Sequence, residues 1–70
     1  MRVRVKIYGG NVVTLTFERR DVTVEDVLRE LGLPPTGALV TRGGRPLVES
    51  ERLRDGDELV VYRLVDFLGL

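Results

Sequence analysis

Hydrophobic and polar residues alternate strictly over residues 2–8, so that apolar side chains fall on one face and mostly basic ones on the other. A period of two predicts a strand with one buried face. The alternation returns over residues 12–17, after Gly9-Gly10-Asn11. Glycine and asparagine tolerate the positive φ angles of tight turns. The two segments therefore predict a β-hairpin.

A helical pattern follows the hairpin. Its apolar positions recur at the i, i+3, i+4 and i+7 spacing of one helix face: Val24, Val27, Leu28 and Leu31. Thr23 can cap the N-terminus, and Asp26 stands where a capping box places its acidic partner. Gly32 supplies the left-handed residue that ends a helix, and Pro34-Pro35 prevents continuation. A helix this short is unstable alone, so we expect it to pack on the hairpin.

Three further strands complete the prediction. Residues 38–42 predict a short strand, and residues 45–48 predict a brief segment that Pro46 confines to a sheet edge. Residues 58–64 predict a last strand after the turn Asp55-Gly56-Asp57. Between them, residues 49–54 are expected to form a helical turn that places Leu53 in the core.

The predicted order is two strands, one helix and three strands. The first and last strands pair most simply in the middle of one mixed sheet of four or five strands, with the helix packed across it. This α+β arrangement is the β-grasp, or ubiquitin-like, fold. We expect residues 1–65 to form the domain and residues 66–70 a C-terminal tail. The expected buried residues are Val3, Val5, Ile7, Leu15, Phe17, Val27, Leu28, Leu31, Leu59 and Val61.

Composition limits the chemistry of the chain. Eleven basic and eleven acidic residues cancel to a net charge of zero. A nucleic-acid-binding domain normally gathers a basic excess on one face, so no nucleic-acid partner is expected. Cysteine and histidine are absent, which removes thiolate nucleophiles, disulfides and the commonest metal ligand. We expect no metal site, no cofactor and no catalytic residue, and the chain is not predicted to be an enzyme.

Residue usage also bears on the cellular setting. Ten of the eleven basic residues are arginine, Asn11 is the only asparagine, and glutamine is absent. Many charges and few thermolabile amides fit heat adaptation, whereas arginine bias also fits a GC-rich genome. No apolar run reaches the length of a transmembrane span. We expect a soluble cytoplasmic protein that does not bind membranes and is a monomer or a weak homodimer.

Several segments, in this order and spacing, are typical of one family. They are residues 22–33, the strand Ala38-Leu39-Val40 with its Gly43-Gly44 turn, and Asp55-Gly56-Asp57 before the last strand. Nearly the whole chain thereby resembles the ubiquitin-like sulfur carriers of the ThiS and MoaD family. In that family an activating enzyme adenylates the final carboxylate, which then receives sulfur as a thiocarboxylate. Some relatives are attached to protein lysines instead.

The resemblance implies a protein partner, either an adenylating activating enzyme or a cofactor-synthesis enzyme. It leaves the pathway open among thiamine, molybdopterin, tRNA thiolation and protein modification. The chain departs from the family at the tail. Members end in Gly-Gly, and by register from Asp55-Gly56-Asp57 that pair would fall near Phe67-Leu68. In the resembled family, glycine lets the tail enter a narrow channel of the activating enzyme, where a side chain would clash.

The tail and the exposed face of the sheet are the candidate site. If Leu59 and Val61 point to the helix, then Val60, Tyr62 and Leu64 point outward. Aromatic residues with arginine, here Arg63, are favoured at recognition sites. The candidate partner-binding residues are Tyr62, Leu64, Phe67, Leu68, Gly69 and Leu70.

Three interpretations of the tail stay open. Phe67 and Leu68 either fold back over exposed core or form a docking peptide, because large apolar side chains are seldom left free in water. Trimming that exposes Gly69 is a third. Two functions follow: a modifier or sulfur carrier that acts through its tail, and a non-conjugating β-grasp adaptor that has lost the Gly-Gly chemistry. Strand packing or a homodimer face could also occupy the open face.

Overall fold

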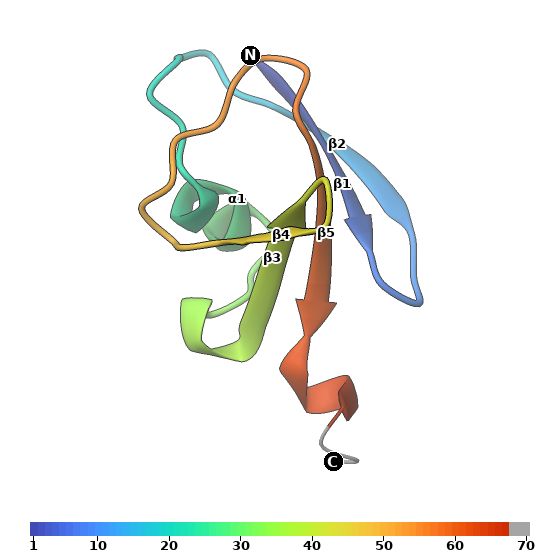
Figure 1. Cartoon of the computed structure of the whole chain (residues 1–70). Helices are drawn as coiled ribbons and strands as arrows, with labels where there is room; N and C mark the ends of the chain where they lie inside the picture. The colour runs from blue at the N-terminus through green and yellow to red at the C-terminus, as the bar shows by residue number, and fades with distance from the viewer. Residues whose placement is uncertain (68–70) are drawn as a thin grey trace.

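A five-stranded mixed sheet crossed by one helix forms the fold, as predicted (Figure 1). The computed structural model describes residues 1–67. The strands follow the order β2-β1-β5-β3-β4, and only β1 and β5 run parallel. Their bounds are Arg2–Ile7 (β1), Val12–Thr16 (β2), Ala38–Arg42 (β3), Arg45–Leu47 (β4) and Glu58–Arg63 (β5). The fold class predicted from the sequence is therefore confirmed.

The parallel pair of β1 and β5 occupies the centre of the sheet. Val5 lies opposite Leu59, and Ile7 lies opposite Val61. Tyr8 extends the pairing beyond β1, because its N–H donates to the Val61 carbonyl at 2.8 Å. Val5 and Val61 have no exposed surface. The expected pairing of the first and last strands is confirmed.

The helix α1 (Val24–Glu30) begins at the predicted capping box. The Asp26 N–H donates to the Thr23 hydroxyl at 3.4 Å, and the Thr23 N–H donates to the Asp26 carboxylate at 2.9 Å. Arg19 adds an ion pair to the same carboxylate at 2.9 Å. These contacts satisfy donors that an isolated helix start leaves free.

Helix α1 ends in a Schellman motif, and Gly32 adopts a φ of 73°. The Gly32 N–H donates to the Arg29 carbonyl at 3.0 Å, and the Leu33 N–H donates to the Leu28 carbonyl at 2.9 Å. The prolines that follow lead into a short 3-10 helix, η1 (Pro35–Gly37), before β3. The predicted helix end is confirmed.

The core lies between α1 and one face of the sheet. Its buried members are Val3, Val5, Val22, Val24, Val27, Leu28, Val40, Leu53, Leu59 and Val61. Most of the predicted core is among them. The exceptions are half-buried at its margin: Ile7, Leu15, Phe17 and Leu31. Leu15 lies on the edge strand β2, so only one side of it has a neighbouring strand.

The expected helical turn over residues 49–54 is wrong. The segment instead begins with a single turn at residues 49–50, closed by the Glu51 N–H donating to the Val48 carbonyl at 3.0 Å, and Arg52 then forms a β-bridge with Thr23. Its backbone also serves the start of α1. The Val24 N–H donates to the Glu51 carbonyl at 3.1 Å, and the Glu25 N–H donates to the Glu49 carbonyl at 2.9 Å. Free N–H groups of the first helical turn are thus satisfied from outside the helix. Leu53 is nevertheless buried, as predicted.

Shortening Leu28 tests the position of the helix on the sheet. Leu28→Ala should lower the free energy of unfolding by about 2–5 kcal/mol, because it opens a cavity in a closed core. Leu39→Ala is the matched control, since Leu39 is 41% exposed. It should cost less than about 1 kcal/mol. Urea denaturation measures both, and equal midpoints for the two variants would contradict this packing.

The capping box makes stability depend on pH. Hydrogen bonds from Thr23 and Arg19 lower the pKa of Asp26 from 3.8 to about 2. The carboxylate therefore stabilises the fold fully above pH 4, and this contribution is lost as the pH falls through about 2. Between these limits the parent should lose on the order of 2 kcal/mol relative to Asp26→Asn. Denaturation at a series of pH values checks this, and parallel profiles for the two proteins would exclude it.

Candidate partner-binding surface

The helix covers one face of the sheet, and the other face is open. Side chains at alternate positions of β1 and β5 reach the open face, including Arg4, Lys6, Glu58, Val60 and Tyr62. Arg4 and Glu58 form an ion pair at 3.4 Å, but both side chains are mostly exposed, so the pair adds little stability. The end of the open face at which β5 begins is therefore polar.

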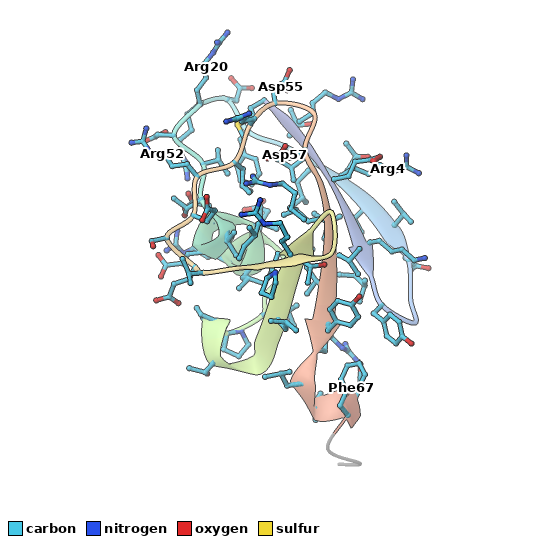
Figure 2. All side chains as sticks on the ribbon, viewed as in Figure 1. Arg4, Arg20, Arg52, Asp55, Asp57 and Phe67 are labelled. Carbon is cyan, nitrogen blue, oxygen red and sulfur yellow. The ribbon has the colours of Figure 1, made fainter. Side chains whose placement is uncertain are left out.

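The opposite end of the open face carries three aromatic rings. The centroids of Tyr8 and Tyr62 lie 4.9 Å apart, and Phe67 lies 5.8 Å from Tyr8 and 6.1 Å from Tyr62. Tyr8 and Phe67 are 54% and 57% exposed. We call these three residues the aromatic surface. Figure 2 shows Phe67 beyond the end of β5, far from the charged residues at the other end of the sheet.

A short 3-10 helix brings Phe67 to this position. It is η2 (Leu64–Phe67), which begins directly after β5. Arg63 holds it in place, because its Nε and Nη2 donate to the two Asp66 carboxylate oxygens, each at 3.2 Å. These hydrogen bonds raise the pKa of Arg63. The last strand therefore ends one residue before its predicted end at Leu64.

Phe67 packs against two tyrosines of the open face and not over the core, where the fold-back interpretation expected it. A docking role for the exposed ring stays a prediction. The division between residues 1–65 and residues 66–70 also stays a prediction, and its boundary falls within η2.

Leu64 faces a different environment from Phe67. With Val65 it lines a shallow, mainly apolar hollow of about 410 Å³, whose other wall includes Leu33 and Pro34. The structure therefore brings Tyr62 and Phe67 together and places Leu64 apart from them. The remaining predicted site residues, Leu68, Gly69 and Leu70, lie outside the described residues.

Sequence reasoning missed Tyr8. It counted Tyr8 with the polar face of the first strand, beside Arg2, Arg4 and Lys6. The available signal was the position of Tyr8 just beyond Ile7, which pairs with Val61 once β1 and β5 are neighbours. That register sets Tyr8 beside Tyr62.

Other chemistry is not apparent in the described part of the chain. Among residues 1–67, no three acidic, histidine or cysteine side chains are placed to hold a metal ion. No helix within the same residues is long and apolar enough to span a membrane.

The sheet order, the parallel central pair and the single crossing helix define a ubiquitin-like β-grasp protein. No protein-family model matches the chain. The chain is, however, similar to solved structures. SAMP1 from Haloferax volcanii is 22% identical, with a TM-score of 0.71 over 90% of this chain and 94% of that chain. The Caldiarchaeum subterraneum ubiquitin is 26% identical, with a TM-score of 0.68 over 90% and 91% of the two chains.

A second structure of small archaeal modifier protein 1 from H. volcanii is 20% identical, with a TM-score of 0.68 over 89% of this chain and 95% of that chain. These structures and the chain therefore share the ubiquitin-like fold. The ubiquitin-like part of the predicted resemblance is confirmed at the level of the fold. The sulfur-carrier part stays a prediction.

Removing one ring tests the aromatic surface. Phe67→Ala should shift the ring-proton resonances of Tyr8 and Tyr62, because both rings lose a neighbouring aromatic. Aromatic pairs are worth about 0.5–1.5 kcal/mol each beyond area burial, so the loss of stability should be small. Val48→Ala is the control, since Val48 is 65% exposed. Tyrosine resonances that respond equally to the two variants would refute the arrangement.

Proposed function

We propose that this chain is a ubiquitin-like protein of the modifier or sulfur-carrier type. It docks on a protein partner through the aromatic surface and presents the tail that follows. The observation that carries this proposal is the location of three contacting rings where the chain leaves the central strand. Tyr8 and Phe67 are more than half exposed. Aromatic residues are enriched at the centres of protein interfaces, so exposed rings of this kind favour a partner-binding surface. A partner that covers these rings also meets the tail.

The partner proposed is an adenylating activating enzyme or an acceptor protein such as a cofactor-synthesis enzyme. In that chemistry, a tail carboxylate oxygen attacks the α-phosphate of ATP and pyrophosphate leaves. A sulfur donor or a lysine amine then displaces AMP, which gives a thiocarboxylate or an amide. The chain is the co-substrate and supplies no catalytic residue. The names of the similar structures, which describe a small archaeal modifier protein and a ubiquitin, support this class.

The tail can reach a partner if η2 unwinds. A residue advances about 2.0 Å in a 3-10 helix and about 3.4 Å in an extended chain. Extending Leu64–Phe67 therefore lengthens the tail by about 1.4 Å per residue. Parting Phe67 from both tyrosines costs on the order of 1–3 kcal/mol. The binding energy of a standard protein interface exceeds this cost.

A non-conjugating adaptor is the second candidate function. The observation that favours it is Phe67 itself, which stands where the resembled family has glycine and packs on the open face of the sheet. A phenyl ring obstructs a channel shaped for glycine. In this function the aromatic surface binds a partner, and no bond forms to the tail.

Binding tests the aromatic surface directly. Tyr62→Ala should weaken binding to a candidate activating enzyme from the same genome by about tenfold or more, as interface aromatics do. Val48→Ala is the matched control, because Val48 is exposed and apolar but does not belong to the aromatic surface. Calorimetric titration of each variant, checked for folding by circular dichroism, gives the comparison. Equal affinities would remove the aromatic surface from the proposal.

Tail chemistry separates the two functions. Replacing Phe67-Leu68 by Gly-Gly and stopping there should give a substrate for adenylation, whereas the unaltered chain should react poorly. The readout is intact mass after incubation with ATP, sulfide and the enzyme, where a thiocarboxylate adds the mass of one sulfur-for-oxygen exchange. Loading of the unaltered chain at an equal rate would refute the steric argument. No loading of either protein favours the adaptor.

A further inference from the structure

The edge strand β2 has no protection against a further strand. Its sequence is Val-Val-Thr-Leu-Thr, without charge, proline or glycine, and these residues favour extended backbone. The opposite edge, β4, is short and contains Arg45 and Pro46, which block pairing. Figure 1 shows β2 at the outer side of the sheet with its free edge uncovered. An unprotected edge is a template for a further strand.

The hydrogen bonds between β1 and β2 determine which backbone N–H and C=O groups of β2 are free. The Phe17 N–H donates to the Met1 carbonyl at 2.7 Å. Bonded pairs alternate along an antiparallel ladder, so odd-numbered residues of β2 bond to β1. The N–H and C=O groups of Val12, Thr14 and Thr16 therefore point to the free edge. Within residues 1–67, no other segment is bonded to them.

This spacing of free groups is self-complementary. When two β2 strands meet antiparallel about a twofold axis at Thr14, Thr14 faces its own copy and Val12 faces Thr16. All of these residues carry free groups, so each opposed pair exchanges both bonds. A register shifted by one residue opposes free groups with groups that are already bonded to β1. A register shifted by two residues shortens the overlap of the two strands. The twofold register at Thr14 thus uses every free group of the edge.

Side chains and charge agree with this register. On the helix side, Val13 meets Leu15 of the other copy and covers the half-buried margin of the core. On the open face, Arg4 lies opposite Thr14 in the same chain. Two Arg4 side chains are then separated by three strand spacings, about 14 Å. That distance exceeds the Debye length of about 8 Å, so their repulsion is screened.

We propose that β2 is a self-association edge, through which two copies of this chain form one continuous sheet centred on Thr14. The occupant is a second copy because the free groups match their own rotated image and the net charge of each copy is zero. The aromatic surface lies at Tyr8, Tyr62 and Phe67, outside β2. Association therefore leaves it free.

Cysteine cross-linking tests the register, since the chain contains no other cysteine. Opposed residues of a bonded pair have Cα atoms about 5.5 Å apart, within disulfide reach. Thr14→Cys should therefore form a covalent dimer about tenfold or more faster than Thr16→Cys under the same mild oxidation. Thr16 is the matched control, because it is exposed on the same strand but sits about 14 Å from its own copy in this register.

Charge substitution gives an independent test of the same register. Thr14→Lys and Thr14→Glu each place like charges in direct opposition, so each variant alone should sediment as a monomer. An equal mixture of the two should form a heterodimer. Circular dichroism confirms that both variants fold. Equal cross-linking of the two cysteine variants, or a parent chain that stays monomeric at about 1 mM, overturns the proposal and leaves this edge to an extended segment of another protein.

Discussion

The parallel pairing of β1 with β5 is the constraint on which the rest of the structure depends. It joins segments more than fifty residues apart, as the Arg4 to Glu58 contact shows. Closing such a long loop costs chain entropy before any contact repays it. Buried apolar pairs such as Val5 with Leu59 supply the compensation. Helix α1 then has a surface on which to pack, and without the pair neither side of the sheet could form.

The same pairing positions both surfaces proposed for partners. Because β1 and β5 run parallel, both strands finish at the same end of the sheet, where Tyr8, Tyr62 and Phe67 meet. The hairpin partner β2 is left on the outside with one free edge. A surface for a different protein and an edge for a second copy thus lie in separate parts of the sheet. Occupation of one does not require release of the other.

Local signals were sufficient to predict much of the fold. The Thr23–Asp26 capping box and the Gly32 helix end depend on residues within a few positions, and both were read correctly from the sequence. The segment at residues 49–54 was not, because its carbonyls are taken by the start of α1, far along the chain. Phe67 posed the same difficulty. Its position depends on Tyr8, which becomes a neighbour only after β1 and β5 pair.

The central claim is that the aromatic surface, rather than the helix side, receives the protein partner. Chemical-shift mapping tests it most directly: the ¹⁵N-labelled chain is titrated with the candidate activating enzyme, and perturbed amides are located on the fold. The account predicts perturbations that cluster at Tyr8, Tyr62 and η2, with little change along α1. Perturbations confined to α1 and the loop at residues 49–54 would contradict it.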